Sequence, residues 1–455
     1  MTSPTLDIVA LPYRRHPLGY FEALRHRRGA VLLDSGKPES PGGRYDILSC
    51  DPLALLEIDN HGHLQCSPSR PLPDDPFKAQ QAMLDSLGEI DVDSDLPFLG
   101  GLIGYWSYDL SRHLEPLPNH AKDATHLPRC RVGLYDWALI QDHQQQRSWL
   151  VASSERRRQV MAWLDEPSSS TTPFRITAPF VAEMDAQDYG ERFRAVQRYI
   201  HSGDCYQINL AQRFSAPYEG DLWQAYRRLR AATPTPFSGF MAWADQGILS
   251  LSPERFLQAR GGSVEARPIK GTRPRGQTPG DDKRLADELV HSDKDRAENV
   301  MIVDLLRNDL GRVCRPGSVQ VPQLCGLESY ANVHHLVSVI QGELDTSYLP
   351  LDLLAAAFPG GSITGAPKVR AMQIIDELEP SRRSVYCGSL GYIDRRGHMD
   401  TSIAIRTAVA EGGHLHLWGG GGLVADSDET AEYHETLDKI SHLLTALDAT
   451  CNVSH

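Results

Sequence analysis

Acidic side chains on two segments with helical patterns are the first residues that could do chemistry. Ser292 opens a segment that ends at Gly311, and both residue types suit the ends of a helix. Glu298 shares one face of that helix with Ile302 and Leu305. A carboxylate on an apolar face must be paired or bind a cation, because burial of an unpaired charge is costly. An ion pair with a neighbouring helix and a cation site therefore both stay open.

A second acidic face lies near the C-terminus. Asp426 and Glu429 have capping-box spacing, which predicts that a helix begins there. Glu432, Glu435 and Lys439 then fall on one face of it. Such a face is either solvated and stabilised by salt bridges or, with a carboxylate from another helix, able to hold a hard cation. Mg²⁺ needs only one or two protein carboxylates and leaves room for a substrate carboxylate.

Lys270 and two glycine-rich stretches complete the candidates. Val264 to Thr272 is predicted to be a strand with Lys270 at its end, where the ordinary interpretation is an exposed lysine. Residues 358–368 form a glycine-rich turn before a helix, but they lack the Gly-Lys-Ser/Thr of a nucleotide-binding loop. Their backbone amides suit a small carboxylate instead. The four glycines at 419–422 allow a ligand to approach the backbone closely.

The elements that position these residues follow two periodicities. Tyr206, Ile208 and Leu210 alternate with polar residues, which predicts a strand. Gly261 and Gly262 stand between two strand-like runs and predict a hairpin. Hairpins and helices interleaved in this way favour an α+β fold with a large antiparallel sheet. A helix after Asp185 is predicted from apolar residues at helical spacing, namely Tyr189, Phe193, Val196 and Ile200.

Two regions are expected along the chain. Residues 166–179 are poor in apolar residues and rich in Ser, Thr and Pro, which indicates an exposed connector. We therefore place a boundary near residue 170. An N-terminal region then covers residues 1–170 and a catalytic domain covers residues 171–455.

The composition argues against several classes of protein. The 455 residues carry a net charge of −13 with no Lys/Arg-rich stripe, so a nucleic acid partner is not expected. No run of about 18 apolar residues occurs and the N-terminal segment lacks a signal-peptide core, so we expect a cytoplasmic protein with no membrane span. The eight cysteines lack zinc-site spacing and are expected to be reduced thiols.

Six motifs, taken in order, resemble the chorismate-utilising enzymes. This family includes anthranilate synthase component I, aminodeoxychorismate synthase component I, and the isochorismate and salicylate synthases. The resemblance spans about residues 185–446 and implies the chorismate-binding fold, and GLIGYWSYDL (101–110) resembles the amino-transferring branch of the family. The motifs are SPERF (252–256), ARPIKGTRPRG (266–276), ENVMIVDLLRNDLGRV (298–313), FPGGSITGAPK (358–368), DTSIAIRT (400–407) and GGGGLVADSDETAEYHETLDK (419–439).

Two positions separate the branches of this family. The motif around position 270 resembles PIAGT in anthranilate synthases. This chain has PIKGT there, which resembles the motif of the aminodeoxychorismate branch. The water-using isochorismate and salicylate synthases carry a lysine base at the position of Gln207, so the glutamine points to ammonia as nucleophile. The resemblance therefore implies conversion of chorismate and ammonia to 4-amino-4-deoxychorismate, for p-aminobenzoate and folate biosynthesis. An anthranilate synthase component I is the alternative enzyme, and an inactive chorismate- or amino-acid-binding regulator is the alternative without catalysis.

The resemblance also implies a covalent mechanism. Lys270 would bond to C2 of chorismate as the 4-hydroxyl leaves, and Glu254 would protonate that hydroxyl. Ammonia would then attack C4 while the lysine departs. Lys270 needs a pKa well below its usual value of about 10.4, and Glu254 needs one above about 4.3.

Mg²⁺ is the implied cofactor, and it would bind the ring carboxylate of chorismate. Glu298 and Glu435 would hold it, with Glu432 and Asp295 as outer partners. The implied substrate-binding residues are Gln207, Gly271, Thr272, His335, Ser362, Tyr386, Arg406, Gly420, Gly422 and Lys439.

The source of ammonia lies outside this sequence. No cysteine sits in a Gly-x-Cys-x-Gly elbow, so ammonia must come from solution or from a separate subunit. The resemblance implies a glutamine amidotransferase partner. Residues 33–35 (Leu-Asp-Ser) lie where feedback-sensitive relatives resemble Leu-Glu-Ser and bind tryptophan, and the aspartate leaves tryptophan binding open.

Overall fold

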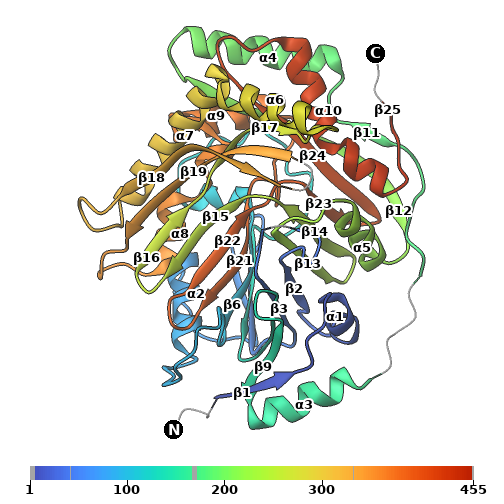
Figure 1. Ribbon diagram of the computed structural model, residues 1–455, viewed down its shortest axis with the longest axis vertical. Coiled ribbons are helices and arrows are strands. Elements are labelled where there is room, and N and C mark those ends of the chain that lie inside the picture. The colour runs from blue at the N-terminus through green and yellow to red at the C-terminus, as the bar shows by residue number, and fades with distance from the viewer. Residues whose placement is uncertain (1–5, 41, 167–171, 331–332, 453–455) are drawn as a thin grey trace.

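The computed structural model describes residues 6–40, 42–166, 172–330 and 333–452 (Figure 1). Within them, two large β-sheets are flanked by helices, which confirms the predicted α+β class. Figure 1 shows α4 and α10 at one end of the molecule and α1 and α3 at the other. The helices are α1 (Leu18–Leu24), α2 (Pro76–Asp85), α3 (Ser154–Leu164), α4 (Ala186–His201), α5 (Leu222–Ala232), α6 (Pro279–Val290), α7 (Asp293–Gly311), α8 (Pro350–Ala357), α9 (Lys368–Leu378) and α10 (Glu429–Ala446), with 3₁₀ turns η1 (Tyr108–His113) and η2 (Gly361–Ile363).

The first sheet has 14 strands among the described residues. Its paired strands run antiparallel there, apart from β11 and β25, which pair in parallel. In order across the sheet they are β1 (Leu6–Leu11), β9 (Arg147–Ser153), β8 (Ala138–Asp142), β3 (Tyr45–Ser49), β2 (Val31–Asp34), β13 (Phe237–Trp243), β14 (Gln246–Ser252), β23 (Thr407–Glu411), β24 (His414–Leu423), β12 (Gln207–Glu219), β11 (Phe180–Ala182) and β25 (Cys451–Asn452), with β10 (Arg175–Ile176) and β20 (Gly365–Ala366) paired to β12.

The second sheet has 11 strands in the described part of the chain. Its order is β17 (Ile269–Pro274), β19 (Val333–Glu343), β16 (Ser263–Ala266), β15 (Arg255–Arg260), β22 (Met399–Ile403), β21 (Ser389–Asp394), β6 (Gly101–Trp106), β7 (Cys130–Tyr135), β4 (Ala54–Ile58) and β5 (Leu64–Ser67), with β18 (Gln320–Ser329) beside β19.

Side chains on the two faces of the first sheet pack into two separate cores. Val31 and Ile248 pack into a cluster shared with the second sheet. Their neighbours Leu32 and Leu249 pack into a cluster with residues of α1, α5 and α10. Successive side chains of a strand point to opposite faces, so this sheet is buried on both sides. The strands that carry the site are thereby held rigidly.

Several local predictions are confirmed. The side chain of Asp185 accepts a hydrogen bond from the backbone of Asp188 and caps α4. Ser292 caps α7 in the same way. The hairpin at the paired glycines joins β15 to β16, with Arg260 opposite Ser263. Each of these signals is local in sequence, which explains why the pattern sufficed.

Two local predictions are wrong. The cap of α10 is Asp428, whose carboxylate accepts from the backbone of Ala431, and not Asp426, which precedes the helix by a turn. Lys270 does not end a strand that starts at Val264. Strand β16 ends at Ala266, and Lys270 is the second residue of the next strand, β17.

The predicted boundary near residue 170 falls on residues 167–171, which lie outside the described residues, and it stays a prediction. Both sheets contain strands from each side of it. Strand β2 pairs with β13 in the first sheet, and β6 pairs with β21 in the second. The two predicted regions therefore share their sheets.

Candidate active site

A cavity of about 460 Å³ opens where β12, β17, β24, α7 and α10 meet. Its size falls in the range of sites for small organic ligands. Gln207 and Glu432, both predicted site residues, lie behind its lining. The predicted residues that line it are Glu254, Lys270, Gly271, Thr272, Asp295, Glu298, His335, Ser362, Tyr386, Arg406, Gly420, Gly422, Glu435 and Lys439.

Lys270 enters this cavity because β17 is irregular at its start. The register against β19 shifts between Ile269 and Thr272, and Gly271 has a φ of +83°. The Lys270 side chain is 13% exposed, and its Nζ lies 3.9 Å from Oε2 of Glu298. Burial lowers the pKa of Lys270, although the charge of Glu298 opposes the shift. The direction of this shift is the one that a nucleophilic amine requires.

Glu254 follows strand β14 and is 5% exposed. Burial raises the pKa of this carboxyl group to about 7. A hydrogen bond from the Ser362 hydroxyl and the charge of Lys270 oppose that shift. Both protonation states are therefore accessible near neutral pH, which suits a group that first donates and then accepts a proton.

Each of three acidic side chains has a lysine partner. Oε2 of Glu298 lies near Lys270, as above, and Oε1 of Glu432 lies 3.5 Å from Nζ of Lys294. The Oε1 of Glu435 is 2.6 Å from Nζ of Lys439. Burial would raise the pKa of Glu435, but Lys439 holds it below its usual value.

These carboxylates fit a magnesium ion by their chemistry. Oε2 of Glu432 is buried without a hydrogen-bond partner. A Cβ atom built on Gly421 would lie 2.9 Å from that oxygen and 3.3 Å from Oε1 of Glu435, so the two side chains converge over one glycine. Oxygen donors of this kind are what Mg²⁺ prefers. As the side chains stand, no group of three or more His, Cys, Asp or Glu residues in the described ranges is placed to hold a metal ion. The predicted outer partner Asp295 is hydrogen-bonded to Arg273 at 3.2 Å.

Arg406 adds a positive charge to the cavity lining. Arg406 has a left-handed backbone with φ of +49°, and its Nη1 lies 3.2 Å from Nε2 of His442. Burial lowers the pKa of Arg406, and no acidic side chain in the described ranges forms an ion pair with it. His335 is held by Thr272, with 2.8 Å between Nδ1 and Oγ1. Burial lowers the pKa of His335 to about 4, so it is neutral. This part of the lining suits an anionic ligand group.

Aromatic and glycine residues shape the remaining wall. Tyr386 stacks on Trp418, with ring centroids 5.8 Å apart and planes 7° apart. Nζ of Lys439 donates to the carbonyl oxygen of Gly420 at 2.6 Å. A Cβ on Gly422 would lie 2.4 Å from Nε2 of the buried Gln207 and 3.4 Å from Nζ of Lys270. Glycine at 422 therefore leaves space for the side-chain amide of Gln207 next to Lys270.

Comparisons with known proteins identify the family. A family model described as chorismate binding enzyme matches residues 30–445. The chain belongs to the chorismate-binding enzymes.

The relatives of this chorismate-binding enzyme cover almost its full length. It is 49% identical over 450 residues to aminodeoxychorismate synthase component 1 of Salmonella typhimurium, covering 98% of this chain and 99% of the relative. It is 47% identical over 456 residues to the protein of that name from Klebsiella aerogenes, covering 99% and 100%. The crystal structure of anthranilate synthase component I from Streptococcus pneumoniae is 30% identical, covers 89% of this chain and 92% of that chain, and gives a TM-score of 0.78. The chorismate-binding fold implied by the motifs is thus confirmed.

The described helices of this chorismate-binding enzyme differ from membrane-spanning helices. Among the described residues, none combines the length and the apolar character that crossing a bilayer requires.

Several residues that line the cavity were not predicted from the sequence, and four of them have polar or aromatic side chains that a ligand could contact. Asn209, Arg273, Lys294 and Trp418 all line the cavity. Asn209 lies on the same face of β12 as Gln207, and Trp418 directly precedes the glycine run, so position relative to predicted residues could have indicated both. Arg273 and Lys294 are likewise adjacent in sequence to predicted residues, namely Thr272 and Asp295.

Lys368, at the end of the glycine-rich turn, binds groups of the protein itself. Its Nζ lies 2.5 Å from Oδ2 of Asp309 and 2.8 Å from the carbonyl oxygen of Ala357. Asp309 lies near the end of α7, and Lys368 is the first residue of α9. The lysine therefore connects two helices, and its charge is paired with Asp309 inside the protein.

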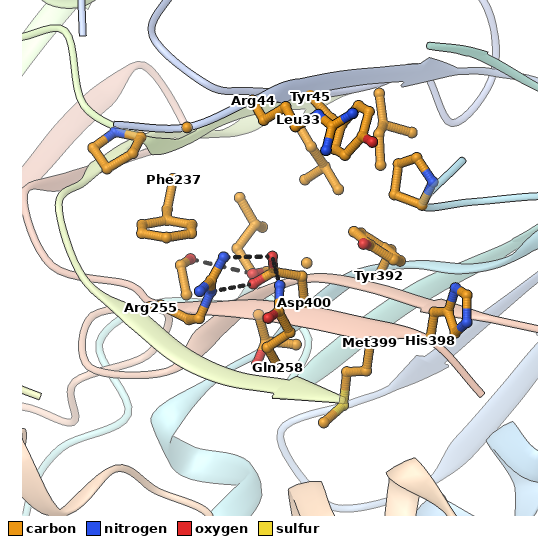
Figure 2. Close-up of a pocket in the computed structure, with 18 of the residues that line it drawn as sticks. Leu33, Arg44, Tyr45, Phe237, Arg255, Gln258, Tyr392, His398, Met399 and Asp400 are labelled. Atoms are coloured by element: carbon orange, nitrogen blue, oxygen red, sulfur yellow. Dashed lines mark hydrogen bonds and ion pairs between the residues drawn. The ribbon is translucent and has the colours of Figure 1, made fainter. Parts of the chain in front are cut away.

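A second cavity of the chorismate-binding enzyme lies beside Leu33, with a volume of about 290 Å³ (Figure 2). Figure 2 shows Arg255 and Gln258 joined to Asp400 along one wall. The rings of Phe237, Tyr45 and Tyr392 lie around the remaining walls.

Asp34 occupies the position of the glutamate in the Leu-Glu-Ser motif that residues 33–35 resemble. Its Oδ2 accepts from Nε of Arg230 at 2.6 Å and from the hydroxyl of Tyr226 at 2.9 Å. The Asp34 carboxylate is fully enclosed. In this chain the acidic residue of the motif is thus neutralised by a protein arginine.

Proposed function

We propose that this enzyme converts chorismate and ammonia into 4-amino-4-deoxychorismate through a covalent bond between Lys270 and the substrate ring. The observation that carries the proposal is the Lys270 amine, buried in the cavity with a lowered pKa and near Glu254. The anthranilate synthases that the motifs resemble have alanine at this position. The full-length relatives at 47–49% identity support the same branch.

The first half-reaction forms the covalent intermediate. The neutral amine of Lys270 attacks C2 of the ring, the two ring double bonds shift, and the bond between C4 and its hydroxyl breaks. Glu254 gives its proton to that hydroxyl, which leaves as water. A pKa of about 7 lets a carboxyl group be protonated at working pH and still transfer its proton readily.

The second half-reaction delivers nitrogen to the ring. Ammonia attacks C4, the double bonds shift back, and the bond between C2 and Lys270 breaks. The new ammonium group passes one proton to the Glu254 carboxylate, which restores both side chains. The net change is chorismate plus ammonia to 4-amino-4-deoxychorismate plus water. Gln207, buried beside Gly422 and 1% exposed, is proposed to lie next to the ammonia.

The remaining residues are proposed to bind chorismate by its two carboxylates. Arg406 has no protein carboxylate as partner in the described ranges, so it suits the enolpyruvyl carboxylate, with Tyr386 beside it. The other proposed contacts are Gly271, Thr272, His335, Ser362, Gly420, Gly422 and Lys439.

We also propose that Glu298 and Glu435 hold Mg²⁺, with Glu432 and Asp295 as outer partners. The convergence of Glu432 and Glu435 over Gly421 supports this assignment. Magnesium, when bound, supplies positive charge that neutralises the ring carboxylate.

Ammonia is proposed to come from a glutamine amidotransferase subunit. The relatives bear the name component 1, which supports the existence of a second component.

The covalent intermediate gives the deciding experiment. Without ammonia, chorismate should add its own mass less that of water to the protein, as read by intact-protein mass spectrometry. Lys270→Ala should lose the adduct and most of the amination at C4. Lys270→Arg should not rescue it, because a guanidinium stays protonated. The exposed Lys283 offers a matched control, and Lys283→Ala should keep both adduct and rate. Full formation of 4-amino-4-deoxychorismate by Lys270→Ala would contradict the proposal.

A further inference from the structure

A buried ion pair lies behind the cavity wall and is not part of the chemistry described above. Arg383 is 1% exposed, and its guanidinium binds Glu379, which is 5% exposed. Nε of Arg383 donates to Oε2 of Glu379 at 2.9 Å, and Nη2 donates to Oε1 at 2.6 Å. This bidentate pair is fully enclosed, so its geometry is fixed by the surrounding backbone.

The guanidinium also binds two segments that line the cavity. Nη1 of Arg383 donates to the carbonyl oxygen of Ile363. Ile363 is the last residue of the η2 turn and directly follows Ser362. Nη2 donates to the carbonyl oxygen of Asn209 at 2.6 Å, on strand β12 two residues after Gln207. One side chain thus connects the turn that carries a partner of Glu254 with the strand that carries the proposed ammonia contact.

The partner carboxylate strengthens the same connection. Oε1 of Glu379 accepts from the backbone N–H of Ala211 at 2.9 Å, again on β12. The Arg383 guanidinium lies 4.9 Å from the ring centroid of Tyr108 and 6.0 Å from that of Tyr386, which lines the cavity. Four elements therefore meet at one ion pair: β12, η2, η1 and the segment of Tyr386.

We propose that Arg383, held by Glu379, is a positioning residue that sets the η2 turn, strand β12 and Tyr386 in register for the substrate. The pair acts through Ser362, Asn209 and Tyr386 and does not itself touch chorismate. This inference rests on the proposed function of the cavity.

The planar fork of arginine is required for this role. Arg383 serves two carbonyl oxygens and two carboxylate oxygens in fixed directions. A lysine carries one point charge on a flexible stem and cannot reproduce that set of directions. A displacement of about 1 Å in a site can cost about 100-fold in rate.

The first experiment compares Arg383→Lys with Arg382→Lys in the full chain. Arg382 pairs with Asp123 near the surface at 3.0 Å and provides the matched control. We expect Arg383→Lys to raise the KM for chorismate and to lower kcat/KM by about 100-fold, and Arg382→Lys to change it by less than about 3-fold. A purely structural role would reduce the folded fraction and leave KM unchanged. An unchanged KM and kcat per folded molecule in Arg383→Lys would overturn the proposal.

A paired substitution separates positioning from stability. Arg383→Met should destabilise the chain because Glu379 is left buried and unpaired, and Glu379→Met with Arg383→Met should recover part of the lost thermal stability. Activity should stay low in the double variant, since nothing then binds the backbone of Asn209 and Ile363. Recovery of both stability and kcat/KM would overturn the proposal.

A substitute variant and an identification of the product complete the test. If Arg383→Lys does not fold, Glu379→Gln replaces it, with the same two outcomes, because it removes the charge and keeps one acceptor oxygen. The product of the unaltered enzyme is identified separately. Formation of another product would refute the proposed function without bearing on the KM comparison.

Discussion

Lys270 and Glu254 are the proposed nucleophile and acid, and burial shifts the pKa of each. Removal from water disfavours the charged form of each group. It therefore lowers the pKa of the lysine and raises that of the carboxyl group to about 7. Both shifts bring the two groups toward their neutral forms, which are the forms that the covalent step requires.

The rate of adduct formation should depend on pH in a defined way. Glu254 must be protonated, so the rate should fall as pH rises through about 7. Lys270 must be neutral, so the rate should also fall at low pH. Single-turnover mass spectrometry without ammonia would measure both limbs. Glu254→Gln should slow the step by about 100- to 10,000-fold and remove the high-pH limb, and a limb that persists would contradict the acid role.

Magnesium affinity should respond to the two proposed ligands. Glu298→Gln and Glu435→Gln each remove a charged oxygen, so each should weaken Mg²⁺ binding at least about 10-fold. Isothermal titration of metal-free protein measures this without reference to activity. Glu429→Gln is the control, because that carboxylate pairs with Arg194 on the surface. Equal affinity in all the variants, or full activity after chelation, would reject the assignment.

At the scale of elements, contact between β24 and α10 brings the acidic face of the helix to the cavity. A Cβ on Gly419 would lie 2.0 Å from the carbonyl oxygen of Thr436 in α10. Glycine there allows the helix to rest directly on the strand, and Gln212 of β12 adds a hydrogen bond to the Thr436 hydroxyl at 2.8 Å. Glu432 and Glu435 lie on the same turn of α10, so their position depends on this contact.

Gly419→Ala should therefore push α10 away from the strand. We expect a loss of about 1–3 kcal/mol in the free energy of unfolding, measured in urea, together with weaker Mg²⁺ binding. Gly311→Ala is the control, because a Cβ built there meets no atom within 4 Å. Equal stability of the two variants would show that the packing tolerates the added methyl group.

For the whole molecule, the sheets bind the first 166 residues to the rest of the chain. Leu32 of β2 pairs with Phe240 of β13, and Tyr105 of β6 pairs with Leu390 of β21. Cutting these pairings would expose the edges of central strands and the apolar cluster between the sheets.

Residues 1–166 expressed alone should not fold. Circular dichroism and hydrogen exchange should show little protected structure, and the full chain should unfold in one cooperative transition. A fragment with native-like exchange protection, or two separate transitions of the full chain, would instead support two independent domains.

The sequence alone determined the family, the helices α4 and α7, and more than half of the residues that line the cavity. These follow from local signals: motifs, caps and short-range periodicity. The predicted cap of α10, Asp426, was wrong by only two residues, because the cap is Asp428.

The tertiary structure alone decided what those side chains experience. The pattern around Lys368 favoured an anion site, but Asp309, 59 residues away, neutralises it. Lys270 looks like an exposed lysine in its strand, and its lowered pKa arises from elements packed around it. Arg383 binds the carbonyl oxygen of Asn209 in β12, which is 174 residues away, and no local pattern records that contact. Burial and long-range pairing depend on which distant segments come together, and only the folded chain fixes that.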